Sequence, residues 1–272
     1  MAVMSVTLQD VLIPGLVLAG IGLFFAVLIV VVSRFFAVAE NKRAAEIRDM
    51  LPGANCGACG FSGCDGYAAA LADGELDITK CPVGGVGLIQ DLSELLGIQP
   101  GVAEPTVAHV MCQGTTEHTG KRYEYSGTLS CSAAHGLFSG PNSCTYGCLG
   151  YGDCVHHCPY GAIDLIDGIA VINENKCKAC GLCVETCPKN LIFMVPKRPG
   201  MTAVSCRNKW PGAQTRKNCT IGCIGCRKCY NVCEFGAITM DGPLAVIDQS
   251  KCTRCGKCEP VCPTHAIQSY FH

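Results

Sequence analysis

Residues 223–233 read CIGCRKCYNVC, and nineteen positions after Cys233 residues 252–263 read CTRCGKCEPVCP. Each run has the spacing C-x2-C-x2-C-x3-C. The first three thiolates of such a run fit three corners of a cubic [4Fe-4S] cluster, because a tight loop wraps the cube. The fourth thiolate lies beyond reach and ligates a neighbouring cluster. Two tandem runs therefore predict two clusters with interlocking ligands: Cys223, Cys226, Cys229, Cys233, Cys252, Cys255, Cys258 and Cys262.

Zinc is the alternative occupant, since paired C-x2-C motifs also suit a tetrahedral zinc ion. Four cysteines per run, with Pro263 after the last, favour iron–sulfur. A zinc-bound structural or interaction module stays open as the competing class of protein, and analysis of iron and acid-labile sulfide separates the two.

Cysteine dominates the composition, with 24 of 272 residues. This density indicates either a disulfide scaffold in an oxidising compartment or a metal-rich protein in a reducing one. Aromatic residues make up only 7%, while 32 residues are glycine. Small modules with so little apolar bulk need additional cross-links, so we expect the cysteine-rich part to fold only with its metal.

The net charge of −1 conceals two halves of opposite sign. Residues 1–175 carry 7 Lys+Arg against 17 Asp+Glu, whereas residues 176–272 carry 14 against 5. A basic half is compatible with nucleic acid. Here Lys228, Arg254 and Lys257 lie inside the cysteine runs, where they offset cluster charge and can steer an acidic redox partner. We therefore expect no nucleic-acid partner.

A long apolar segment precedes the cysteines. Residues 11–33 contain no charged side chain, and 16 of the 23 are Leu, Ile, Val or Phe. As a helix this segment is about 34 Å long, enough to cross a hydrocarbon core of about 30 Å. Positive residues follow it at Arg34, Lys42, Arg43 and Arg48. The positive-inside rule then predicts residues 1–10 outside and the cysteine-rich domains in the cytoplasm, where thiols stay reduced.

Cleavage of this segment as a signal peptide is less favoured. Ala37-Val38-Ala39 resembles a cleavage site, but no Lys or Arg lies before Asp10. The apolar run is also longer than a signal-peptide core. We expect a retained membrane anchor.

Residues 51–64 read LPGANCGACGFSGC, and Cys81-Pro82 follow. The glycines suit a loop that wraps a cluster with positive φ angles. An alanine-rich segment at 67–71 and a helical apolar stripe at 85–96, stopped by Gly97, surround the motif. Residues 34–98 are therefore predicted to be a small, mostly helical domain with one [4Fe-4S] site on Cys56, Cys59, Cys64 and Cys81, and zinc is the alternative.

An internal repeat appears when the chain is shifted by 75 residues. Nine cysteines then each coincide with a cysteine 75 positions later, so that Cys187, for example, coincides with Cys262. The nine are Cys131, Cys144, Cys148, Cys154, Cys158, Cys177, Cys180, Cys183 and Cys187. Asp167-Gly168 and Asp241-Gly242 lie between short apolar segments and predict hairpins. We expect ferredoxin-like modules at 131–200 and 201–272 after a linker at 99–130 that contains Cys112.

The first module lacks one ligand, because Tyr151 stands where the second has Cys226. Cys144 is the nearest replacement, and Cys112 or Cys131 are alternatives. With Cys144 assigned, the chain has five [4Fe-4S] sites. Four cysteines are then left, the number that a sixth cluster needs: Cys112, Cys131, Cys206 and Cys219. They are otherwise buried thiols or partners across the interface between modules.

The layout resembles the B subunit of the Rnf electron-transport complex, in its longer form with two ferredoxin modules. The resemblance rests on the N-terminal anchor, the stretch LPGANCGACGFSGCDGYAAAL with CPVGG after it, and the ferredoxin runs. It implies an α+β chain with one transmembrane helix, a small 4Fe-4S domain and two tandem 2[4Fe-4S] modules. The Cys148-x5-Cys154 spacing departs from the simple ferredoxin pattern.

The resemblance implies a bacterial cytoplasmic-membrane complex that transfers electrons between ferredoxin and NAD and translocates Na+ or H+. In such a complex this chain would receive electrons from soluble ferredoxin and pass them to flavin-bearing and membrane subunits. The sequence has no G-x-G-x-x-G or Walker loop, so no complete active site is expected in this chain alone. An iron–sulfur subunit of another membrane oxidoreductase is the alternative, against which the Cys56–Cys81 motif argues.

Overall fold

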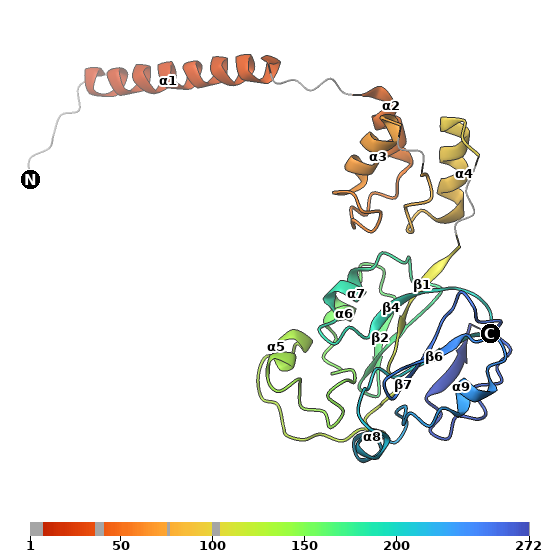
Figure 1. The fold of residues 1–272 in the computed structure, drawn as a ribbon. Coiled ribbons are helices and arrows are strands. Elements are labelled where there is room, and N and C mark those ends of the chain that lie inside the picture. The colour runs from red at the N-terminus through yellow and green to blue at the C-terminus, as the bar shows by residue number, and fades with distance from the viewer. Residues whose placement is uncertain (1–7, 36–40, 75–76, 100–103, 272) are drawn as a thin grey trace, which may run out of the picture.

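The computed structural model describes residues 8–35, 41–74, 77–99 and 104–271. Most of the expected N-terminal segment 1–10 and the start of the expected linker therefore lie outside the described residues. Helix α1 (Leu8–Phe35) extends away from the other described elements (Figure 1). Its segment Gly15–Arg34 has a mean hydropathy of 3.0 and no buried residue, so it is long and apolar enough to cross a membrane.

The next elements are helical: α2 (Lys42–Met50), α3 (Cys64–Ala72) and α4 (Gly85–Leu96). Their shared core includes Ile47, Tyr67 and Leu92, which are fully buried. The Tyr67 hydroxyl donates to the Asp77 carbonyl at 3.0 Å, so the buried phenol is satisfied. The predicted helix at 85–96 is confirmed, and Gly97 ends it with a φ of 69°.

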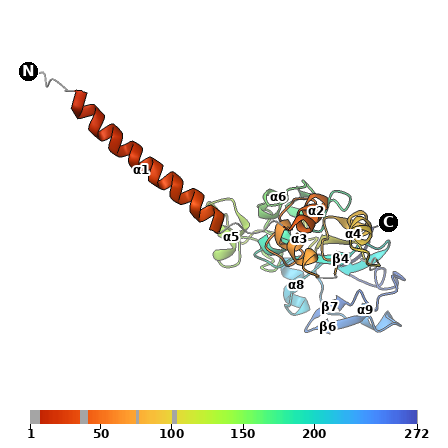
Figure 2. The same ribbon diagram turned by 90° about the horizontal axis from the view of Figure 1, so that it is seen from above.

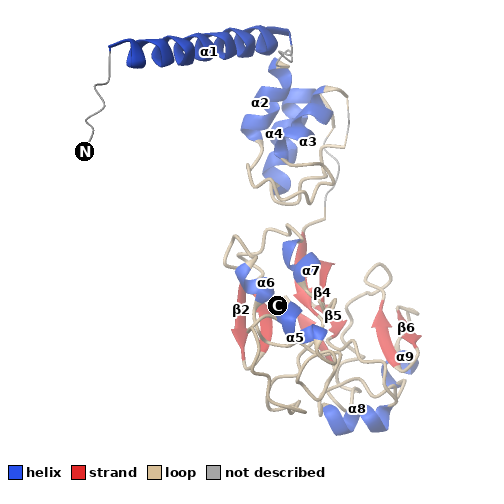
Figure 3. Cartoon of the chain, turned by 90° about the vertical axis from the view of Figure 1, so that its left-hand side faces the viewer, coloured by secondary structure: helices blue, strands red, loops and turns tan. Residues whose placement is uncertain are grey.

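Strands are confined to the rest of the described chain, as Figure 3 shows. Two hairpins match the Asp-Gly predictions: β2 (Ile163–Ile166) with β3 (Ile169–Ile172), and β6 (Ile238–Asp241) with β7 (Leu244–Ile247). Asp167 and Gly168 both have positive φ, as the tight hairpin turn requires. The short helices are α5 (Cys131–Gly136), α6 (Asp153–His156), α7 (Leu182–Thr186), α8 (Gly212–Asn218) and α9 (Lys228–Val232).

Two further strand pairs give each repeat a second small sheet. β1 (Thr106–Val110) pairs with β4 (Ile192–Pro196), and β5 (Met201–Val204) pairs with β8 (Ile267–Tyr270), both antiparallel. The segment 99–130 is thus not simply a linker. Sequence periodicity missed β1. The strand has only five residues and its partner lies more than 80 positions later, so apolar residues are its only local signal.

The strand registers fix which residues of the two repeats are equivalent. Val110 faces Ile192 in the first repeat, and Val204 faces Ile267 in the second. Ile192 and Ile267 are 75 positions apart, so Val110 is equivalent to Val204. Two residues after each valine comes a cysteine, Cys112 or Cys206. Cys206 therefore corresponds to Cys112, and not to Cys131 as the uniform shift of 75 suggested.

The repeats consequently differ by an insertion. Cys112 and Cys144 are 32 positions apart, whereas Cys206 and Cys219, their counterparts, are 13 apart. The additional residues of the first repeat include α5, which begins at Cys131. Cys131 therefore belongs to a segment that the second repeat lacks. The turned view in Figure 2 shows α5 at the side of the molecule away from β6 and β7.

Candidate metal centres

The 24 cysteines gather into six groups of four, here called sites 1 to 6. The first three groups are site 1 (Cys56, Cys59, Cys64, Cys81), site 2 (Cys158, Cys177, Cys180, Cys183) and site 3 (Cys131, Cys148, Cys154, Cys187). The others are site 4 (Cys112, Cys144, Cys206, Cys219), site 5 (Cys223, Cys226, Cys229, Cys262) and site 6 (Cys233, Cys252, Cys255, Cys258). All 24 thiols are free.

The donor sets fit cubic clusters better than single ions. Among the described residues, no three Cys, His, Asp or Glu side chains converge closely enough to hold one metal ion. The cysteines of sites 3 to 6 instead line cavities. Four thiolates around open space match a [4Fe-4S] cube, in which each sulfur binds a different iron. Because ligation requires thiolates, filling these sites releases protons.

Site 1 is organised by the loop before α3. The Asn55 side-chain oxygen accepts the Cys64 backbone N–H at 2.9 Å. A Cβ at Gly63, whose φ is 126°, would lie 3.1 Å from that oxygen, so glycine allows the loop to close. Burial raises the pKa of the Cys81 thiol, and the charges of Cys59 and Cys64 raise it further.

Sites 2, 5 and 6 contain the cysteines that the ferredoxin spacing predicts. In site 2 the run Cys177, Cys180 and Cys183 meets Cys158 from the earlier run. In site 5 the run Cys223, Cys226 and Cys229 meets Cys262. Burial raises the pKa of Cys183 and Cys258 to about 12, and neighbouring thiols contribute in both cases.

Site 3 differs from the sequence expectation in one residue. Cys148, Cys154 and Cys187 line a cavity together with Cys131, and Cys144 is not among its lining residues. Cys131 takes this place instead of Cys144 because of the insertion. The insertion brings α5 to the corner of site 3 that has no cysteine, since Tyr151 stands at the position of Cys226.

Asp153 fixes the start of α5 beside site 3. Its carboxylate accepts the backbone N–H of Cys131 at 2.8 Å, that of Ser132 at 3.0 Å and the Ser130 hydroxyl at 3.0 Å. Burial alone would raise the pKa of Asp153, but these donors lower it below its ordinary value. The second repeat has Lys228 at the equivalent position and no insertion to hold. In the sequence, the presence of a carboxylate at position 153 in the first repeat only was the feature that could have pointed to Cys131 as a member of site 3.

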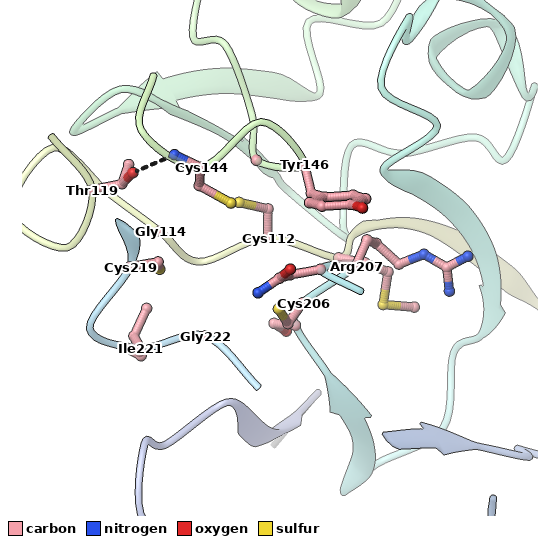
Figure 4. Close-up of a pocket in the computed structure, with 14 residues that line it drawn as sticks. Cys112, Gly114, Thr119, Cys144, Tyr146, Cys206, Arg207, Cys219, Ile221 and Gly222 are labelled. Atoms are coloured by element: carbon pink, nitrogen blue, oxygen red, sulfur yellow. Dashed lines mark hydrogen bonds between the residues drawn. The ribbon is translucent and has the colours of Figure 1, made fainter. Parts of the chain in front are cut away.

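Site 4 lies between the repeats, with two cysteines from each. Figure 4 shows Cys112 and Cys144 from the first repeat facing the same cavity as Cys206 and Cys219 from the second. The Cys144 N–H donates to the Thr119 hydroxyl at 3.2 Å, and Thr119 in turn donates to the Asn218 carbonyl at 2.9 Å. Burial raises the pKa of Cys112 to about 12 and of Cys206 to about 11. Three of the four cysteines left over in the sequence analysis, Cys112, Cys206 and Cys219, thus meet here, and Cys144 joins them. Cys131, the fourth, lies in site 3 instead.

Adjacent sites lie near one another in a single series. Cys56 of site 1 is close enough to Cys180 of site 2 to raise its thiol pKa, although burial is the larger cause. Cys154 and Cys183 join sites 3 and 2 in the same way. The Cys148 N–H donates to the Cys112 sulfur at 3.4 Å, linking sites 3 and 4.

The series continues through the second repeat. The Cys223 N–H donates to the sulfur of Cys206, which links sites 4 and 5. Cys229 lies near Cys258, which links sites 5 and 6. Site 4 is therefore the link between the two repeats among the cysteine sites of the described residues.

Comparison with known proteins agrees with this division of the chain. A family described as putative Fe-S cluster matches residues 51–83, one described as 4Fe-4S binding domain matches 170–193, and one described as 4Fe-4S dicluster domain matches 222–266. The B subunit of the Na(+)-translocating ferredoxin:NAD(+) oxidoreductase complex of Acetobacterium woodii is 40% identical over 96% of this chain and 78% of the relative. The chain belongs to the family of Rnf B subunits.

Two further members show the same extent of similarity. The B subunit of the ion-translocating oxidoreductase complex of Methanosarcina acetivorans is 39% identical over 93% of this chain and 96% of its own length. The B subunit of the proton-translocating ferredoxin:NAD(+) oxidoreductase complex of Clostridium ljungdahlii is 37% identical over 93% of this chain and 90% of its own length. The similarity to Rnf B subunits thus extends over more than nine-tenths of this chain and is not confined to the cysteine runs.

Proposed function

We propose that this chain is the membrane-anchored iron–sulfur subunit of an Rnf-type complex and relays electrons from reduced ferredoxin to other subunits. The observation that carries the proposal is the continuous series of six four-cysteine sites. When bound, a [4Fe-4S] cluster gains or loses one electron at a time. The remaining chemistry of ferredoxin:NAD oxidoreduction and Na+ or H+ translocation belongs to flavin-bearing and membrane partners.

In this proposal the ligands of five clusters are the cysteines of sites 1, 2, 3, 5 and 6, with Cys131 as the fourth ligand of site 3. Sites 2 and 3, and sites 5 and 6, then form two 2[4Fe-4S] ferredoxin-like modules. Each pair interlocks through the last cysteine of a run, as in bacterial ferredoxins.

Site 4 holds a sixth cluster in this proposal. Two ligands from each repeat make it a cross-link between the modules as well as a redox site. The support is geometric: the cavity collects the four cysteines that the ferredoxin modules leave unused. Because Cys112 contacts site 3 and Cys206 contacts site 5, these two cysteines carry the connection between the modules.

The surrounding residues shield the sites from water and set their environment. Cys64, Cys81, Cys144, Cys154, Cys183, Cys219, Cys229 and Cys262 are buried. Burial and backbone N–H groups near sulfur are two of the means by which a protein sets the potential of such centres. The amides of Ala162 and Ala266 donate to Cys158 at 3.4 Å and to Cys262 at 3.3 Å, and each of these cysteines is the last of its run.

We further propose that α1 anchors the chain in the bacterial cytoplasmic membrane, with its N-terminus outside. Arg34 at the end of α1 and the basic residues of α2 support a cytoplasmic location for everything that follows.

Metal analysis of the anaerobically purified full chain tests the proposal. Six occupied sites give about 24 irons and as much acid-labile sulfide per chain. Stoichiometric zinc without sulfide would instead support a structural module. A full iron content with no reduction by ferredoxin would favour a subunit of a different membrane oxidoreductase.

A further inference from the structure

The two repeats present equivalent faces that differ in what covers them. Adding 75 converts Cys180 into Cys255 and Tyr160 into Phe235. In the first repeat this face lies near site 1 of the helical domain, since Cys56 and Cys81 of that site are close to the Tyr160 phenol, as is Cys180. In the second repeat no described residue plays the part of site 1.

The uncovered face exposes the last site of the series. Cys226 and Cys255 are the exposed cysteines of the described chain, whereas Cys180 is only partly exposed. Phe235 lines the cavity of site 6 and is 50% exposed. A half-exposed phenylalanine beside a redox site suits contact with another protein, since aromatic residues are enriched at interfaces.

The two faces also differ in charge, and the face of the second repeat has the more positive residues. Ala179 and Leu182 of the first repeat correspond to Arg254 and Lys257 of the second. Ala179 and Arg254 share a left-handed backbone, with φ angles of 56° and 60°, so the local loop shape is preserved. Residues 148–187 carry 2 Lys+Arg and 5 Asp+Glu, whereas residues 223–262 carry 5 and 4.

Acidic groups offset part of this positive charge. Lys257 pairs with Glu234 at 2.7 Å, and Lys251 lies 3.7 Å from Asp248. Arg254 donates to the Pro199 carbonyl at 3.3 Å. Arg227 and Lys228, both exposed, directly follow Cys226 of the neighbouring site 5. The first repeat has Lys178 two residues before Cys180, where the second has Thr253, but it has Gly152 and Asp153 where the second has Arg227 and Lys228. The face around Cys255 together with Cys226 is therefore more positive than its counterpart.

The helical domain itself indicates what kind of partner fits. Residues 41–98 carry 4 Lys+Arg and 8 Asp+Glu around one four-cysteine site. This acidic domain is tethered to the first repeat and needs no long-range attraction. A free partner docking on the second repeat gains from electrostatic steering, because opposite charges raise the rate of encounter.

We infer that the face formed by Phe235, Arg254, Lys257 and the loop of Cys255 is the docking site for an acidic, diffusible protein that carries a low-potential iron–sulfur centre near its surface. The partner brings its centre near site 6, as the helical domain brings site 1 near site 2. One electron leaves the carrier, which is oxidised, and is taken up at site 6, with no bond formed or broken. This inference rests on the proposed relay, and it assigns entry to site 6 and exit to site 1.

Exchange of repeat residues tests the docking site. The double variant Arg254→Ala with Lys257→Leu gives the second repeat the residues of the first. The matched control is Arg216→Ala with Lys217→Leu on α8, which removes the same charge from positions outside the cysteine runs. Both are made in the full chain in detergent, and reduction by a reduced acidic 2[4Fe-4S] ferredoxin is followed by stopped flow at several salt concentrations.

We expect the docking variant to lower the second-order rate constant about tenfold at low salt and to flatten its salt dependence. The control should keep both close to the unmodified values. Equal loss in both variants, or no loss in the docking variant, overturns the docking site. Iron content and reduction by dithionite report separately on the relay, so intact values with unchanged ferredoxin kinetics reject the docking site alone.

Cross-linking gives a second readout that needs no variant. A carbodiimide joins lysine to carboxylate only where the two proteins touch. Cross-links from ferredoxin to Lys251 or Lys257, located by mass spectrometry and lost at high salt, are expected. Cross-links confined to Lys217 or to lysines of the helical domain would place the docking site elsewhere.

Discussion

Restoring a cysteine at position 151 tests the ligand exchange between Cys131 and Cys144. Cys131 belongs to the insertion, and Tyr151 occupies the position of Cys226 in the second repeat. We predict that Cys131→Ala removes the cluster of site 3, which lowers the iron content from about 24 to about 20 atoms per chain. Adding Tyr151→Cys to this variant should return the content to about 24.

The matched control uses the cysteine that sequence spacing favoured. Cys144→Ala should also lose about four irons, but from site 4, so Tyr151→Cys should not restore them. The Tyr151 ring lies 5.7 Å from the Tyr125 ring, and loss of this contact should cost only about 1 kcal/mol. A cysteine at 151 therefore should not unfold the repeat.

The assay is iron and acid-labile sulfide per chain on anaerobically purified protein, with EPR spin integration after dithionite reduction. The magnetic interaction between paired clusters of the first module should disappear in Cys131→Ala and persist in Cys144→Ala. The reasoning is refuted if Tyr151→Cys rescues Cys144→Ala and not Cys131→Ala, or if Cys131→Ala keeps the full iron content.

Three other perturbations follow from the same geometry. Cys206→Ala should lower iron by about four atoms and stop electrons supplied by ferredoxin from reaching site 1; rapid-freeze EPR measures this, and unimpeded reduction of site 1 would show a second route. Gly225→Ala should destabilise the second repeat by about 1–3 kcal/mol, because the φ of Gly225 is 70° and a Cβ there would lie 2.7 Å from the Pro243 carbonyl oxygen. Thermal unfolding measures this loss, and the control is Gly242→Ala, whose added Cβ would have no atom within 4 Å. Asp153→Ala should cost about 1 kcal/mol at pH 7, and because hydrogen bonds lower the pKa of Asp153, its contribution should be lost only as the pH falls below about 4; equal stability of the two proteins at pH 7 would refute this role.

Local patterns predicted several elements of the fold and the cysteine runs that the structure brings together. The C-x2-C-x2-C-x3-C runs place three sulfurs on one loop, so sites 2, 5 and 6 could be assigned from spacing. The hairpins at Asp167-Gly168 and Asp241-Gly242 and the helix at 85–96 were equally local, since turn residues and a 3.6-residue period determine them. The structure confirms both hairpins and this helix.

The cysteine groups of sites 3 and 4 could not be predicted in this way. A uniform shift of 75 residues aligned Cys131 with Cys206, but the pairing of β1 with β4 and of β5 with β8 aligns Cys112 with Cys206. That register depends on strands far apart in the chain, which no local window contains. Asp153, at a position where the second repeat has Lys228, was the clue that the sequence offered.

The exchange also explains how the two modules come to be joined. In the second repeat Cys226 completes site 5, which leaves Cys206 free to face Cys112 across the interface. In the first repeat the insertion supplies Cys131 in place of the residue at 151, which leaves Cys144 free for site 4. Each repeat thus contributes two cysteines beyond those that its own pair of sites uses.

Iron and acid-labile sulfide, counted on the full chain purified without oxygen, test the central claim most directly. Six sites predict about 24 of each per chain, and essentially no zinc. A chain with no iron, or with thiols paired as disulfides, would contradict the account.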